Sequence, residues 1–213
     1  MKRVIIFDFD GVLADSLAPM LSYAKQVCLE LGVDKTPAQS DLEALDRMEF
    51  SAFGHQLGIP GDQIEVFVRR NHQLFSEREE TIKIKTGMGA VVSALAEDNT
   101  LAIITGNSCT QVEKFLDAYQ LLEKFQTILC AEHEGNRLEK IYKVQSMVDS
   151  QITDCYMIGD AISDIRAART AGIKSIAVSW GHQSKEKLSR EAPELIVDEP
   201  EDLLRYFLGD HGI

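Results

Sequence analysis

The sequence predicts an α/β fold in which a Rossmann-like, doubly wound parallel sheet forms the core and carries an inserted, all-helical cap. From residue 87 onward, short apolar runs alternate with helix-length segments, which is typical of parallel strands joined by helical crossovers. A similar apolar run opens the chain at residues 4–7, and the long stretch between these two parts has helical spacing only. We therefore expect a core domain of residues 1–14 and 83–213 and a cap domain of residues 15–82.

The first elements are one strand and several helices. Residues 4–7 are apolar and β-branched or aromatic, as is typical of a strand buried on both faces. Segment 16–31 carries apolar residues at helical spacing, with Ser16 as a suitable N-cap residue and Gly32 as a suitable end. Region 36–78 also has helical spacing and contains no strand-like run. These helical segments together predict the cap.

The second part of the chain predicts five further strands. They lie at residues 101–104, 127–130, 155–158, 175–178 and 195–197. Segments with helical spacing precede the first four of these strands, and a last helix, 201–208, follows the fifth. Helices between successive strands favour a parallel sheet, and we expect the strand at residues 4–7 to join it.

The composition narrows the functional classes. The 213 residues carry a net charge of −12, and such an acidic surface disfavours nonspecific binding to nucleic acid or anionic membranes. No apolar stretch is long enough to span a bilayer. Cys28, Cys109, Cys130 and Cys155 form no CxxC pair, so we expect reduced thiols and a cytoplasmic protein. The sequence is compatible with a monomer or a homodimer.

Four carboxylates follow strands of the predicted sheet. Asp8 and Asp10 come directly after the first strand, and Asp160 and Asp164 follow the strand at residues 155–158. The carboxyl ends of parallel strands meet at one edge of the sheet, where open α/β sheets bind their ligands. Carboxylate oxygens are the ligands that Mg²⁺ prefers. We therefore expect a magnesium site in which Asp8 and Asp160 bind through their carboxylates, Asp10 contributes its backbone carbonyl, and Asp164 binds directly or lies just behind the ligands.

A phosphate-binding turn is predicted at the same edge. Thr105, Gly106 and Asn107 follow the strand at residues 101–104 and precede a helix, whose N-terminal amides suit an anion. Phosphoryl chemistry also calls for a basic side chain that balances the charge of the phosphate. Arg137 and Lys140, at the start of the helix before the Asp160 strand, are the two candidates.

Two further features are expected to lie outside the site. The five histidines show no paired spacing, and we expect each to be structural or exposed. Arg69 and Arg70 in the cap are adjacent basic residues that could reach an anionic substrate, but a solvated helix face is the better interpretation.

The motifs resemble those of the haloacid dehalogenase superfamily of aspartate-based phosphohydrolases. They are Asp8-Phe9-Asp10-Gly11-Val12 for its DxDx(T/V) motif, Ile103-Ile104-Thr105-Gly106-Asn107 for its strand ending in Thr or Ser, and Gly159-Asp160-Ala161-Ile162-Ser163-Asp164 for GDxxxD. The helical insert is similar to the type 1 cap of that superfamily. Asp15-Ser16 and Trp180-Gly181 are similar to phosphoglycolate phosphatase-like members.

This resemblance implies a Mg²⁺-dependent phosphatase that hydrolyses a small, phosphoglycolate-like metabolite. Asp8 would be the nucleophile that forms an aspartyl-phosphate, and Asp10 would protonate the leaving alcohol and then activate water. The superfamily's third motif is a Lys in a KP-like setting, and no KP occurs here. The spacing to Asp160 favours Arg137 for that role, with Lys140 as the alternative.

Other functions stay open at this point. Within the superfamily, the alternatives are a β-phosphoglucomutase-like phosphomutase and a phosphonatase, which needs a Schiff-base lysine in the cap, where Lys25 and Lys35 lie. A dehalogenase is disfavoured because that chemistry does not use the Asp10 acid. A noncatalytic phosphate-binding regulatory protein is the alternative from another class, although a binder need not keep Asp10 beside Asp8.

Overall fold

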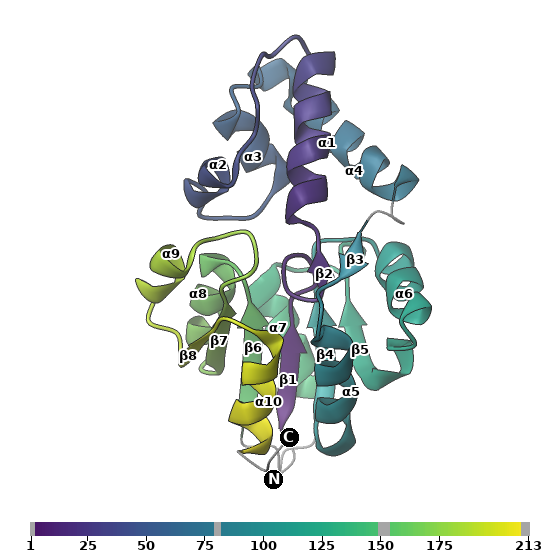
Figure 1. Cartoon of the computed structure of the whole chain (residues 1–213), viewed down its shortest axis with the longest axis vertical. Helices are drawn as coiled ribbons and strands as arrows, with labels where there is room; N and C mark the ends of the chain where they lie inside the picture. Colours follow the sequence, from purple (N-terminus) through teal and green to yellow (C-terminus); the bar gives the residue numbers. More distant parts are fainter. Residues whose placement is uncertain (1–2, 79–81, 149–153, 210–213) are drawn as a thin grey trace.

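The computed structural model describes residues 3–78, 82–148 and 154–209 and has the α/β architecture that the sequence predicts (Figure 1). Six strands form the main sheet: β1 (Val4–Phe7), β4 (Thr100–Ile104), β5 (Phe125–Leu129), β6 (Cys155–Gly159), β7 (Lys174–Val178) and β8 (Leu195–Val197). Their order is β5-β4-β1-β6-β7-β8, and all neighbours are parallel. The order changes direction at β1, which is the switch point where such sheets bind ligands.

Helices pack on both faces of this sheet. They are α5 (Met88–Asp98), α6 (Cys109–Ala118), α7 (Arg137–Met147), α8 (Ile162–Thr170), α9 (Lys185–Ser189) and α10 (Pro200–Leu208), with a short 3-10 turn, η3 (Leu122–Lys124). Because alternate strand residues point to opposite faces, β1 contributes to two apolar clusters. Ile5 and Phe7 pack with α5, α6 and α10, whereas Val4 and Ile6 pack with α7 and α8.

The segment between β1 and α5 is mainly helical. It contains α1 (Leu17–Glu30), α2 (Gln39–Glu43), α3 (Phe50–Gln56), η1 (Gly61–Gln63) and α4 (Ile64–Glu77), which we call the cap helices. They lie together beyond the carboxyl end of β1, and α4 packs against both α1 and α3 (Figure 1). Buried Phe53 and Phe67 meet edge to face between α3 and α4, which holds this part together without the sheet.

A two-stranded ribbon connects the cap helices to the sheet. β2 (Ala14–Asp15) pairs antiparallel with β3 (Lys83–Ile84), where the chain leaves the main sheet and returns to it. The expected boundaries at 14/15 and 82/83 fall on this ribbon, and the division into two domains stays a prediction. The sequence does not predict β2 or β3, because a strand of two residues has no recognisable periodicity.

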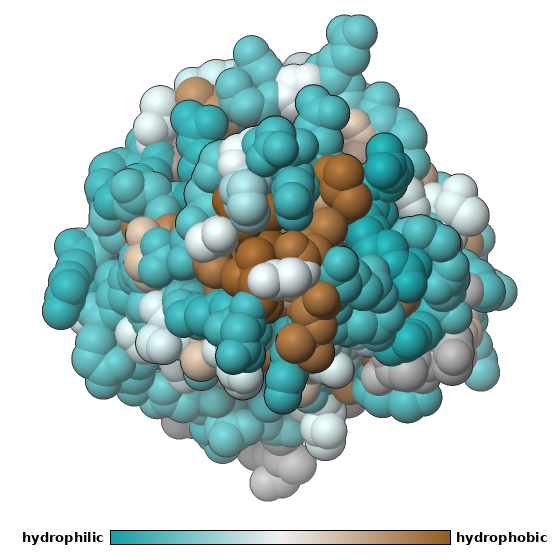
Figure 2. Space-filling model, turned by 90° about the horizontal axis from the view of Figure 1, so that it is seen from above, coloured by the Kyte–Doolittle hydropathy of each residue, from teal (hydrophilic) through white to brown (hydrophobic). Residues whose placement is uncertain are grey.

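The view onto the cap helices shows apolar side chains gathered at the centre of their outer face, with hydrophilic side chains around them (Figure 2). Leu29 of α1 and Val66 of α4 are exposed large apolar residues of these helices. Single exposed apolar residues are normal on protein surfaces, so these two alone do not define a contact site.

The expected strands are present, with small shifts at their ends. β5 differs most, since it begins at Phe125 and ends at Leu129 where residues 127–130 are expected. Among the described residues, no helix combines the length and the apolar character that crossing a bilayer requires.

Candidate active site

The carboxyl ends of three neighbouring strands form the floor of the site. Asp8 follows β1, Thr105 follows β4 and Asp160 follows β6, and all three side chains are buried. A cavity of about 690 Å³ lies above them, between this edge of the sheet and the cap helices. The structure therefore places the expected strand-end residues in one cavity.

Three carboxylates crowd together beneath this cavity. Oxygen atoms of Asp8, Asp160 and Asp164 lie within 4.8 Å of one another. Burial raises the pKa of Asp8, against the opposing charge of Arg137, and it raises the pKa of Asp164 to about 8. Burial therefore outweighs the effect of the guanidinium that contacts this cluster.

Arg137 reaches these acids from the first turn of α7. A capping box at Asn136 and Glu139 fixes the start of this helix, so the Arg137 side chain leaves the helix at a defined point. Its Nη2 donates to Asp8 Oδ2 at 3.1 Å, and its Nη1 forms an ion pair with Asp164. Arg137 thereby links the acids that follow β1 and β6.

Lys140, one turn further along α7, has a different environment. Its buried Nζ donates to the carbonyl oxygens of Thr105 at 3.2 Å and Cys130 at 2.6 Å. These carbonyls follow β4 and β5, so Lys140 holds the backbone under the phosphate-binding turn. Of the two basic candidates, Arg137 contacts Asp8 and Lys140 contacts only the backbone of its neighbours.

The turn after β4 faces Asp10. The backbone N–H of Asn107 donates a hydrogen bond to Thr105 Oγ1 at 3.0 Å, which closes the turn. Its side-chain amide donates to Asp10 Oδ2 at 3.4 Å, and Gly106 lines the same cavity. Burial raises the pKa of Asp10 to about 6, so this carboxyl group holds a proton more readily than an exposed one.

His182 lines the cavity, although the absence of paired spacing among the histidines predicts a structural or exposed residue. The residue follows β7 at the same edge of the sheet, and its Nδ1 lies 2.5 Å from Asp160 Oδ2. Its backbone N–H also donates to this oxygen, and its Nε2 lies 3.3 Å from Ser16 Oγ. Burial disfavours the charged ring, but the charge of Asp160 outweighs this and raises the pKa of His182 to about 9. Its position after a predicted strand was the available signal.

Gly11 makes room for this arrangement. Its φ is +74°, and a Cβ there would lie 2.0 Å from Asp160 Oδ2 and 2.5 Å from His182 Nδ1. A side chain at this position would therefore both strain the backbone and displace the acid and the imidazole.

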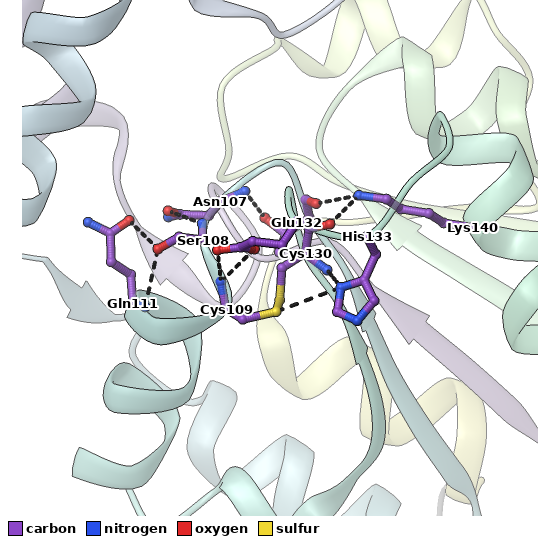
Figure 3. Close-up of a disulfide and its surroundings, with 9 residues drawn as sticks. Asn107, Ser108, Cys109, Gln111, Cys130, Glu132, His133 and Lys140 are labelled. Atoms are coloured by element: carbon purple, nitrogen blue, oxygen red, sulfur yellow. Dashed lines mark hydrogen bonds between the residues drawn. A yellow bond between two sulfur atoms is a disulfide. The ribbon is translucent and has the colours of Figure 1, made fainter.

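A disulfide lies next to the phosphate-binding turn (Figure 3). It joins Cys109, the first residue of α6, to Cys130, which directly follows β5. The expectation of four reduced thiols is therefore wrong for these two, whereas Cys28 and Cys155 are free. The two cysteines are 21 residues apart, and the pairing of β4 with β5 brings them together. Because two of the four cysteines are oxidised, free thiols no longer support a cytoplasmic location, which stays a prediction.

Hydrogen bonds hold the backbone of both disulfide cysteines in place. The Cys109 backbone N–H donates to the Glu132 carboxylate at 3.0 Å, at the positive end of α6. The Cys130 backbone N–H donates to His133 Nδ1 at 3.0 Å, and the Cys130 carbonyl accepts from Lys140. The disulfide and Lys140 thus hold the segments after β4 and β5 against each other.

We predict that Gly11→Ala destabilises the protein by about 3 kcal/mol, the sum of left-handed backbone strain and steric overlap. The matched control is Gly32→Ala, where φ is +75° and no atom lies within 4 Å of the added Cβ. That control should lose only about 1 kcal/mol. Urea denaturation of both variants measures the difference, and equal losses would contradict the packing described for Gly11.

We predict that reduction of the disulfide lowers the free energy of unfolding by about 3 kcal/mol, because the unfolded chain regains the entropy of a loop of this length. Urea denaturation with and without dithiothreitol measures the loss. Cys130→Ser should remove the response to reductant, and Cys155→Ser, which alters a free cysteine, should keep it. A wild-type midpoint that does not change on reduction would show that the disulfide is absent in solution.

Comparisons with known proteins agree with this geometry. The family model described as haloacid dehalogenase-like hydrolase matches residues 5–178. A phosphoglycolate phosphatase of Synechococcus elongatus is 25% identical over 205 residues, which cover 95% of this chain and 96% of that protein. "Probable phosphatase IndB" of Dickeya dadantii is 26% identical over 209 residues, covering 93% of this chain and 90% of that one.

Solved structures show the same fold. A haloacid dehalogenase-like hydrolase of Streptococcus pneumoniae superposes with a TM-score of 0.83 at 21% identity, over 97% of this chain and 98% of that one. A predicted phosphatase of Clostridium acetobutylicum superposes with a TM-score of 0.82 at 21% identity, over 98% of this chain and 99% of that one. The predicted fold class and the resemblance are both confirmed. The chain belongs to the haloacid dehalogenase-like hydrolase family, and within that family it is a phosphatase.

Proposed function

We propose that this phosphatase is Mg²⁺-dependent and hydrolyses a small phosphorylated metabolite through an aspartyl-phosphate on Asp8. The observation that carries the proposal is the position of the Asp8 carboxylate. One oxygen accepts from Arg137 and the other from the backbone N–H of Phe9, so the group is held in one orientation at the floor of the cavity. Thr105 and Asn107 line the same cavity and provide groups for a phosphate beside it.

The acid cluster fits a divalent cation. Asp8, Asp160 and Asp164 offer oxygens within 4.8 Å of one another, and burial raises the pKa of Asp8 and of Asp164 even with Arg137 beside them. The buried Oδ1 of Asp10 has no hydrogen-bond partner among the described residues, which leaves this carboxyl group available for the proton transfers described next. A bound Mg²⁺ would offset the negative charge between Asp8 and the phosphate.

The residues of the chain then account for two displacements. In the first, an Asp8 oxygen forms a bond to phosphorus, the bond from phosphorus to the leaving oxygen breaks, and Asp10 gives its proton to that oxygen. In the second, water gives a proton to Asp10 while its oxygen bonds to phosphorus and the bond to Asp8 breaks. The pKa of Asp10 near 6 suits both proton transfers. Arg137 balances charge, and Lys140 supports the turn that carries Thr105.

The alternatives find less support. A phosphonatase needs a lysine in the cavity, but among the described residues that line it there is none, and Lys35 forms an ion pair with Asp41. A phosphomutase and a noncatalytic phosphate-binding protein differ from a phosphatase in what they release, and the experiments below separate them. Phosphoglycolate as the substrate, and a monomer or homodimer as the assembly, stay predictions.

We predict that Asp8→Asn lowers turnover by at least about 1,000-fold, because a neutral amide cannot form the covalent intermediate. Phosphate release from p-nitrophenyl phosphate, measured with Mg²⁺ and with EDTA, tests this. EDTA should abolish the wild-type activity. Asp117→Asn, at an exposed position on α6, is the matched control and should keep it. Wild-type turnover by Asp8→Asn would exclude the nucleophile, and no release by the wild type would favour the mutase or the binder.

We predict that Asp10→Asn slows turnover by about 100-fold, the usual contribution of a general acid. The loss should be larger for an alkyl phosphate than for p-nitrophenyl phosphate, because nitrophenolate leaves without a proton. Steady-state rates for the two esters, compared between wild type and variant, give this ratio. An equal loss for both esters would mean that Asp10 does not protonate the leaving group.

A further inference from the structure

The part of the cavity above the catalytic floor has a mainly apolar wall, in which the polar residues are Ser16, Glu49, Ser51, His72 and Ser76. The cap helices and the segments between them contribute six apolar side chains to it: Met20, Leu45, Met48, Phe50, Val68 and Phe75. At about 690 Å³, the whole cavity falls in the range that holds drug-sized ligands, which is far more than a two-carbon acid fills.

The charges around the cavity do not suit an anionic leaving group. Among the described residues that line it, the cations are Arg137 and His182, and both are engaged with acids on the floor. From the cap side, the charged residue is Glu49, which would repel a carboxylate. His72 packs edge to face on Phe50, and desolvation lowers its pKa, which favours the neutral ring.

The basic pair of the cap does not supply the missing charge. Arg70 of α4 forms ion pairs with Glu30 at 2.9 Å and Glu77 at 3.7 Å, and neither Arg69 nor Arg70 lines the cavity. A carboxylate placed against the apolar wall would lose its hydration without gaining a cation, which is strongly unfavourable.

We infer that the alcohol leaving from this site is apolar, an alkyl or aryl group larger than glycolate, so that the substrate is a phosphomonoester with a hydrophobic leaving group. This inference rests on the proposed phosphatase function. The phosphate end occupies the floor at Asp8, and the apolar end contacts the wall that Met48, Phe50 and Val68 form. The names of several relatives include phosphoglycolate phosphatase, so the inference assigns this chain a substrate other than the one in those names.

A homologous series of esters tests the inference. The substrates are phosphoglycolate and the phosphates of ethanol, butanol and hexanol, with p-nitrophenyl phosphate as the general phosphatase substrate. Each methylene moved from water to the apolar wall should raise kcat/KM by about fourfold. Hexyl phosphate should therefore exceed ethyl phosphate by about 100-fold or more. Phosphoglycolate should be the poorest of the four. A preference for phosphoglycolate over hexyl phosphate would overturn the inference.

Binding separates this inference from the proposed function. Calorimetric titration of Asp8→Asn with hexyl phosphate, phosphoglycolate and inorganic phosphate requires no turnover. Tighter binding of hexyl phosphate than of phosphoglycolate supports the apolar site, even if no ester is hydrolysed and the proposed function fails. Equal binding of both esters, or tighter binding of phosphoglycolate, overturns it while leaving the phosphatase chemistry intact.

A pair of variants on α4 locates the effect. Val68 lines the cavity, whereas Val66, two residues away on the same helix, is exposed on the outer face. Val68→Lys should shift the ratio of kcat/KM for phosphoglycolate over hexyl phosphate at least tenfold toward phosphoglycolate. Val66→Lys should leave this ratio unchanged, and melting temperatures check that both variants fold. An unchanged ratio in folded Val68→Lys would place the leaving group elsewhere.

Discussion

The crowding of buried carboxylates around one guanidinium is the constraint on which the rest of the site depends. Because β1 and β6 are parallel neighbours, the residues that follow them, Asp8 and Asp160, emerge side by side. Asp164 adds a third carboxylate, and Arg137 brings one positive charge from α7. Buried like charges at this separation are stable only with further compensation. The acids therefore favour a cation, and the capped first turn of α7 fixes the point from which Arg137 reaches them.

His182 and Gly11 show how the remaining structure adapts to this cluster. The His182 imidazole, in the segment that follows β7, pairs with the Asp160 carboxylate through Nδ1. Its Nε2 contacts Ser16 Oγ, directly before α1. Because Gly11 has no side chain, the turn after β1 leaves room for the contact between His182 Nδ1 and Asp160 Oδ2. Asp160, His182 and Ser16 thus form one buried set of contacts that runs from the sheet to the start of α1. A substitution at one of these residues is expected to displace the others.

The parts of the structure that the sequence predicts are those set by local pattern. Apolar runs and the acids that end them follow from neighbouring residues, and the fold and the strand-end positions of Asp8 and Asp160 could be read in this way. His182 does follow a predicted strand, but its contact with Asp160 and the Cys109–Cys130 disulfide could not be read in this way, because each depends on how separate strands pair. The choice between two basic residues one turn apart on α7 likewise depends on where that helix packs.

Charge and apolar surface are divided between the two sides of the cavity. The floor is built from strand ends, where backbone turns and helix N-termini can hold acids and a phosphate. The cap helices line the opposite side of the cavity with apolar side chains such as Phe50 and Val68. Gln183 ties the two sides together, since its amide donates to the carbonyl of Leu45 while its oxygen accepts from Ile162. Side chains of the cap that take no part in these links, such as Phe50 and Val68, can therefore change while the acids stay in place, and a shared family chemistry does not fix a shared substrate.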